Sequence, residues 1–236
     1  MEVFIVDTKR NVEVDPGQIG EIWVRGPSVA AGYWNLPRET EATFNAFLDS
    51  GRGPFLRTGD LGFLQNGELF VTGRIKDLII VRGRKHYPQD IEQTVEGSHC
   101  EIHLKSSVAI SVPTQEGPQL VILAEVHRRL RSHQANSKVG EASPSEGYCD
   151  EIMDAIRKAV SEQHELQVAA ISLLVPGSIP RTSSGKIRRH ACCDAILTGS
   201  FDCIASWTLA DFRHRSLNEP SVYSSDARLE VINADE

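Results

Sequence analysis

The order of apolar and polar residues predicts mostly β-structure in residues 1–73. The apolar runs there are short, at 3–6 and 21–25, and turn residues separate them. Asn66-Gly67 has apolar residues on both sides, and this dipeptide is the strongest short signal for a tight β-hairpin. One segment differs, because apolar residues recur at helical spacing after Pro37, which predicts a helix from about that residue.

After residue 73, strand patterns alternate with helix patterns. Apolar runs predict strands at 77–81, 106–112, 119–126 and 168–175. Helical periodicity and terminal signals predict helices at 88–97, 149–166 and 185–199. Residues 131–148 are polar and rich in serine and glycine, which predicts a long loop.

These patterns predict an α+β protein with two structured parts. The first, 1–73, is a β-rich piece of a larger domain, and the second, 74–200, is a small α+β domain of about three strands and three helices. Residues 201–236 are polar and irregular, and they form a tail that the pattern does not assign.

Composition narrows the class of protein. The chain has 236 residues, 40% hydrophobic and 24% charged, which is ordinary for a soluble globular protein. Its net charge of -7, without a long basic run, argues against nucleic-acid binding, and no apolar run approaches a membrane span. The five cysteines are odd in number and two of them, Cys192 and Cys193, are adjacent. This pattern favours a reducing compartment over a disulfide framework, so we expect a cytoplasmic location.

Residues 180–189, PRTSSGKIRR, combine a Gly-Lys pair with three hydroxyl side chains. This composition suggests a phosphate site, but the Walker A pattern requires a glycine five positions before the Gly-Lys glycine and a hydroxyl residue after the lysine. Pro180 and Ile187 stand at those two positions. Either Lys186 reaches a phosphate through another geometry, or the segment is a polar turn before a helix.

Four motifs occur in a fixed order that is specific when they are taken together. They are GEIWVRGPSVAAGYW (20–34), RTGDLG (57–62), GRIKDLIIVRGRKHYPQDIE (73–92) and IPRTSSGKIRR (179–189). In this order, from residue 3 to about 199, the chain resembles the adenylate-forming superfamily of acyl-CoA synthetases, peptide-synthetase adenylation domains and luciferases. The residues of these motifs are most similar to those of the fatty-acyl-AMP ligases. The resemblance implies that 1–73 ends the large adenylation domain and that 74–200 is its mobile C-terminal domain.

The resemblance implies nucleotide-binding roles for Asp60 and Arg74. A carboxylate such as that of Asp60 can accept hydrogen bonds from the two hydroxyls of the AMP ribose. The alternative is a turn aspartate that bonds its own backbone. The planar guanidinium of Arg74 suits ribose and phosphate acceptors. The alternative is a surface salt bridge with an acid such as Asp77.

Two further segments take roles from the resemblance. Lys76 stands at the hinge about which the small domain rotates, and the alternative is an ordinary lysine beside a strand. Arg82, Gly83 and Arg84 lie where thioester-forming relatives border the pantetheine tunnel, so they are candidates for contacts with phosphopantetheine or an acidic carrier protein. The alternative is a solvated basic loop.

Lys186 is the catalytic candidate. The resemblance implies that it supplies a cation where negative charge builds between the attacking carboxylate and the α-phosphate, once its loop has closed. We expect the hydroxyl residues 182–184 to keep the loop polar and to help start a helix. Arg188 and Arg189 are expected to be surface charges on that helix.

The function implied is activation of a fatty acid with ATP and Mg²⁺ to an acyl-adenylate, followed by transfer to the phosphopantetheine thiol of a carrier protein. Two alternatives remain open: part of a fatty acyl-CoA synthetase, or a non-catalytic module that binds a carrier protein or another partner. The sequence lacks the superfamily's phosphate loop and its adenine loop, whose glutamate holds Mg²⁺. We therefore expect the C-terminal part of a longer enzyme, inactive alone, with Mg²⁺ bound mainly outside this chain.

Overall fold

The computed structural model describes residues 1–114, 117–128, 130 and 144–209, and it divides into two compact units. The first unit is Met1–Pro88 and the second is Gln89–Glu236. The boundary predicted after residue 73 therefore falls inside the first unit. In the described part of the chain, no helix is both long enough and apolar enough to cross a membrane.

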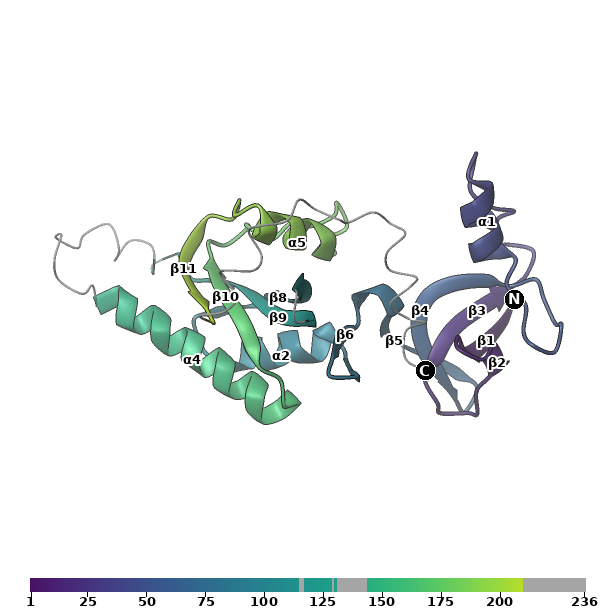
Figure 1. Ribbon diagram of the computed structural model, residues 1–236, viewed down its shortest axis with the longest axis horizontal. Coiled ribbons are helices and arrows are strands. Elements are labelled where there is room, and N and C mark those ends of the chain that lie inside the picture. Colours follow the sequence, from purple (N-terminus) through teal and green to yellow (C-terminus); the bar gives the residue numbers. More distant parts are fainter. Residues whose placement is uncertain (115–116, 129, 131–143, 210–236) are drawn as a thin grey trace. The chain divides into compact units, whose positions relative to one another are not determined.

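The first unit is built on an antiparallel sheet with the strand order β2-β1-β3-β4-β5 (Figure 1). The strands are β1 (Glu2–Asp7), β2 (Val12–Glu13), β3 (Gly20–Arg25), β4 (Leu56–Gln65) and β5 (Glu68–Arg74). The core beneath it consists of Phe4, Val6, Trp23, Leu48 and Phe55. The predicted hairpin is confirmed, since Asn66 and Gly67 join β4 to β5 with φ of 53° and 81°, as a type I′ turn requires.

Short elements complete the first unit. The predicted helix is confirmed as α1 (Pro37–Phe44), with proline in its first turn. A 3₁₀ turn, η1 (Ile75–Asp77), precedes a small hairpin of β6 (Ile79–Val81) and β7 (Arg84–His86). The strand predicted to start at residue 77 therefore begins two residues later, because the chain first makes the 3₁₀ turn.

The second unit has a sheet in the order β11-β10-β9-β8 with helices on both faces. The strands are β8 (Ile102–Thr114), β9 (Gly117–Val126), β10 (Val168–Leu174) and β11 (Cys203–Thr208), and β9 and β10 are parallel. Helices α2 (Pro88–Ser98) and α4 (Pro144–His164) lie on one side of the sheet, and α5 (Arg189–Leu197) lies on the other (Figure 1). Alternate β8 residues such as Val108 and Ile110 pack with Cys192 and Cys193 of α5.

Three predictions for the second unit are corrected. Residues 203–208, expected to belong to an unassigned tail, form β11, so the sheet has four strands among the described residues. Helix α4 begins at Pro144, inside the predicted loop, whose residues 131–143 lie outside the described part. Helix α5 begins at Arg189 and not at residue 185. The α+β class is confirmed, and all five cysteines are free thiols.

Leu123 on β9 tests the position of the core. Leu123→Ala removes a side chain that is 0% exposed, so we expect a loss of about 2–5 kcal/mol in the free energy of unfolding. The matched control, Leu104→Ala on β8, truncates a side chain that is 77% exposed and should change this free energy by about 0.5 kcal/mol or less. Urea denaturation followed by circular dichroism measures both, and equal losses would contradict the described core.

Candidate functional site

Asp60 and Arg74 face each other across the β4–β5 ladder. Arg74 Nε lies 2.8 Å from Asp60 Oδ1, and the two side chains are 53% and 32% exposed. The salt bridge considered for Arg74 therefore exists with Asp60. This pair presents a carboxylate and a guanidinium together at a surface that water reaches, the arrangement that can contact a hydroxyl and an anion of one ligand.

A buried carboxylate, which the sequence analysis missed, organises the backbone before Asp60. Glu21 on β3 is 2% exposed and accepts hydrogen bonds from Trp23 Nε1 at 2.9 Å and from Arg57 Nε at 3.0 Å. Arg57 Nη2 lies 2.9 Å from the same carboxylate, and the Gly59 N–H donates to it at 3.1 Å. A charge this deeply buried is tolerated because it is fully paired.

The residues beside this carboxylate form an irregular stretch of β4. The β3–β4 register shifts between Glu21 and Trp23, and Gly59 there has a φ of 69°, which favours glycine. Thr58 Oγ1 donates to the Ile22 carbonyl at 2.7 Å and accepts from the Asp60 N–H at 3.0 Å. The RTGD segment therefore holds Asp60 through contacts to β3.

The sequence did contain one signal for Glu21. It is the charged residue in the otherwise apolar run EIWV, and an acid at an inward-facing strand position requires partners. What the sequence could not provide was the identity of those partners, because Arg57 and Gly59 lie more than thirty residues away along the chain.

The hinge and acceptor candidates lie in short exposed segments of the first unit. Lys76 is an exposed residue of the 3₁₀ turn η1. Arg82 and Gly83 form the two-residue turn between β6 and β7, with φ of 50° and 74°. This geometry is a type I′ turn, and it leaves the Arg82 and Arg84 side chains exposed.

Lys186 lies in a hairpin turn that comes before helix α5. Thr182 N–H donates to the Lys186 carbonyl at 2.8 Å, and Thr182 Oγ1 accepts from the Lys186 N–H at 3.0 Å. A β-bridge between Arg181 and Ile187 closes the turn, and Gly185 has a φ of 80°. These contacts explain the wrong helix start, since Thr182 stabilises the turn and does not cap α5.

Arg181 anchors the hairpin from the side. Its Nη1 donates to the Gly185 carbonyl at 3.1 Å, and its Nη2 donates to the Lys105 carbonyl on β8 at 2.6 Å. The buried Glu125 of β9 accepts the Ile179 N–H at 2.8 Å, just before the hairpin. Lys186 itself is exposed, and no described carboxylate forms an ion pair with it. The turn is held, and its cation stays available.

Arg189 corrects another prediction, because it is not a surface charge. Its side chain is only 17% exposed, and Nη2 donates to both oxygens of Glu92 on α2, at 2.7 and 2.8 Å. Burial raises the pKa of Glu92 above the usual value of a glutamate, although Arg189 and a backbone N–H favour the ionised form. The guanidinium faces inward because only there does it meet a carboxylate that also needs a partner.

The structure thus brings Asp60 and Arg74 together in the first unit and places Lys186 in the second.

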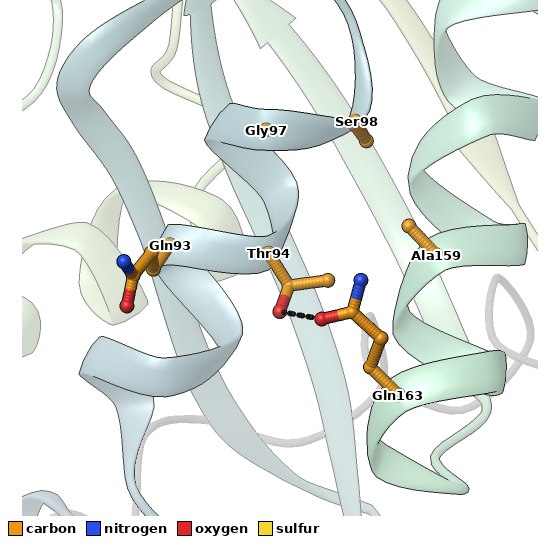
Figure 2. Close-up of a pocket in the computed structure, with 6 residues that line it drawn as sticks. All are labelled: Gln93, Thr94, Gly97, Ser98, Ala159 and Gln163. Atoms are coloured by element: carbon orange, nitrogen blue, oxygen red, sulfur yellow. Dashed lines mark hydrogen bonds between the residues drawn. The ribbon is translucent and has the colours of Figure 1, made fainter.

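A separate polar cleft of about 330 Å³ lies between α2 and α4 (Figure 2). Thr94 Oγ1 donates to Gln163 Oε1 across it at 2.9 Å. None of the predicted site residues lines this cleft. Among the described residues, no group of three or more His, Cys, Asp or Glu side chains could hold a metal ion.

Comparison with known proteins identifies the family of this chain. The model of the Disco-interacting protein 2-like AMP domain matches residues 76–206, more than half of the chain. The chain belongs to this family. The resemblance to adenylate-forming fatty-acyl-AMP ligases, proposed from four motifs, is thereby confirmed.

Several curated relatives of the chain are named as ligases of fatty acids. It is 48% identical over 203 residues to the medium-chain-fatty-acid–[acyl-carrier-protein] ligase JamA of Moorena producens, covering 86% of this chain and 32% of JamA. It is 43% identical over 206 residues to the long-chain-fatty-acid–AMP ligase FadD26 of Mycobacterium marinum, covering 85% and 33%. The chain spans about a third of the length of these relatives.

Solved structures agree on the fold. A fatty acyl-adenylate ligase structure from a study of the E. coli and L. pneumophila enzymes is 30% identical, with a TM-score of 0.61, covering 84% of this chain and 31% of that one. The McyG A-PCP structure, complexed with phenylalanyl-adenylate, is 26% identical with a TM-score of 0.64, covering 84% and 28%.

Glu21→Gln tests whether the buried carboxylate holds the RTGD segment. It replaces the charged acceptor of Arg57 and Gly59 by a neutral amide, so we expect the free energy of unfolding to fall by about 1–3 kcal/mol. We also expect faster hydrogen exchange at the Gly59 and Asp60 amides. The control, Glu2→Gln, breaks exposed pairs with Arg25 and Arg52 and should have a much smaller effect. Urea denaturation and amide exchange measure both variants, and equal effects would show that burial of Glu21 does not matter.

Proposed function

We propose that this chain supplies the ribose-binding and catalytic segments of an ATP-dependent fatty-acyl-AMP ligase. The observation that carries the proposal is the position of Lys186, which is exposed on a hairpin. Hydrogen bonds within the turn and to β8 hold this hairpin in place. The names of JamA and FadD26 support a fatty acid as substrate, and the name of FadD26 supports AMP as the group joined to it. We also propose the cytoplasmic location that the cysteine pattern of the sequence predicts.

Each candidate residue has a proposed role. Asp60 accepts hydrogen bonds from the ribose hydroxyls, and Arg74 beside it contacts ribose or phosphate. Lys186 stabilises the charge that develops as the fatty carboxylate attacks the α-phosphate and pyrophosphate leaves. Lys76, which lies inside the first unit, is proposed as the hinge about which the C-terminal domain of 74–200 rotates. The described residues offer no cluster of side chains that would hold Mg²⁺.

The acceptor of the acyl group is proposed to be the phosphopantetheine thiol of a carrier protein. JamA is named as a ligase to acyl-carrier protein, which supports this choice. A second candidate is coenzyme A, because a relative in Mycobacterium tuberculosis, 46% identical over 195 residues, is named as a fatty-acid–CoA ligase. A non-catalytic carrier- or partner-binding module is the third reading.

A chimaera tests catalytic competence. Residues 1–236 alone should form no acyl-AMP from fatty acid, ATP and Mg²⁺, because the sequence lacks the phosphate and adenine loops. Replacing the matching 203-residue segment of JamA by this chain's segment should restore formation. Lys186→Ala in the chimaera should then lower the adenylation rate by about 10²–10⁴-fold. Mass spectrometry of acyl-AMP measures each rate.

The control for this test is Lys158→Ala, which removes an exposed lysine of α4 and should leave the rate unchanged. A folded chimaera without activity would favour the non-catalytic module. Equal rates for Lys186→Ala and the control would remove Lys186 from the mechanism.

Arg82 and Arg84 test the acceptor side separately. The double variant Arg82→Gln, Arg84→Gln in the chimaera should slow transfer from preformed acyl-AMP to a phosphopantetheinylated carrier protein by about tenfold, because exposed charges mainly set the encounter rate. Adenylation should not change. Parallel assays with coenzyme A show which acceptor depends on the two arginines. If the double variant transfers to both acceptors at the unchanged rate, Arg82 and Arg84 belong to a solvated basic loop.

A further inference from the structure

The Glu92–Arg189 ion pair connects two helices that lie on opposite faces of the sheet, and it does so beside the edge strand β8. The sheet order places β8 at the edge, with α2 on one face and α5 on the other (Figure 1). Glu92 comes from α2 and Arg189 from α5, and the Ala109 N–H of β8 donates to the same Glu92 carboxylate at 3.1 Å. One carboxylate therefore joins both helical layers and the strand between them.

A second glutamate of α2 continues this arrangement. Glu96 Oε1, one helical turn after Glu92, accepts from the backbone N–H groups of Ser106 and Ser107 at 3.1 and 3.3 Å. Successive outward N–H groups of an edge strand need partners, and here side chains of α2 supply them. The position of α2 along β8 is therefore fixed by several bonds, which makes Glu92 a firm anchor point.

The start of α5 depends on a charge from outside the helix. Its N-cap is Arg188, no side chain caps it, and its first turn contains no acid. A cation such as Arg189 is unfavourable at a helix N-terminus, where the macrodipole is positive. The Glu92 carboxylate places the missing negative charge there, and it does so through both oxygens.

The fixed start of α5 is directly connected to the Lys186 hairpin. Arg189 follows Lys186 by three residues, and between them the Arg188 N–H donates to the Pro180 carbonyl at 2.9 Å, across the base of the hairpin. Arg181 holds the other arm at the Lys105 carbonyl. Both arms are thus attached near β8, one by an exposed hydrogen bond and the other by a partly buried ion pair.

We propose that Glu92 and Arg189 are positioning residues for the hairpin that carries Lys186. Through Arg189, the α2 carboxylate fixes the direction in which the chain leaves the hairpin, and so limits the positions that the Lys186 ammonium reaches. The importance of this for catalysis rests on the proposed function of Lys186. The mechanical link itself belongs to this chain and can be measured without any activity.

Hydrogen exchange in the full chain tests the link. In Glu92→Gln, we expect the hydrogen-bonded amides of Thr182, Lys186 and Arg188 to exchange at least about tenfold faster, because local opening no longer breaks a charged pair. The amides of Val121 and Leu123 in the central strand β9 should change by less than about twofold. NMR-detected exchange measures both sets in one sample.

Two further variants make the result decisive. Arg189→Lys keeps the charge but loses the guanidinium Nη2 that donates to both carboxylate oxygens, and it should show the same selective acceleration to a smaller degree. The control Thr94→Val removes a polar contact from another face of α2, to Gln163 and His164, and should leave the hairpin unchanged. Equal acceleration in hairpin and β9 would overturn the proposal, because the ion pair would then stabilise the whole unit only.

The JamA chimaera adds the catalytic readout. Glu92→Gln should lower the rate constant of adenylation by about tenfold and leave transfer from preformed acyl-AMP unchanged, since only the first step uses Lys186. If selective exchange is observed but the chimaera is inactive, the positioning holds and the proposed function fails. If exchange is not selective, the positioning fails whatever the chimaera does.

Discussion

A carboxylate that is removed from water must be paired on nearly every side, and in this protein two glutamates meet that requirement with partners from separate elements. Glu21 bonds to Trp23 on its own strand and to Arg57 and Gly59 on β4. Glu92 bonds to α5 and to β8. Because an unpaired buried charge is so unfavourable, these bonds fix the relative positions of the elements that contribute them.

Each fixed set of elements adjoins an exposed candidate residue. In the first unit, the segment bonded to Glu21 leads directly into Asp60, which faces Arg74 in the ladder. In the second, the helix paired with Glu92 follows the Lys186 hairpin. Both units therefore combine a buried charge network with a side chain that water reaches. Such a division is suited to chemistry on a ligand, since the backbone is held while the reactive group stays accessible.

The chain belongs to the Disco-interacting protein 2-like AMP-domain family, and a held backbone beside an accessible side chain is consistent with that membership. The chain spans about a third of the length of its fatty-acid ligase relatives, and its match to the family model lies in the part that contains the hairpin. The candidate residues are present together with the buried contacts that support them. This combination favours the proposed catalytic role over a binding module.

The sequence by itself determined the features that depend on neighbours along the chain. Asn66-Gly67 gave a hairpin because its backbone preference is local, and Pro88 with the following pattern gave α2 for the same reason. The motif order also predicted the family. The tertiary structure alone decided which partners the buried charges meet. Ile187 has the spacing of a helical residue, yet it forms a β-bridge to Arg181. Arg189 has the sequence pattern of a surface cation, yet it forms an ion pair with Glu92 of α2. These outcomes depend on contacts between residues distant in sequence, and local periodicity contains no information about them.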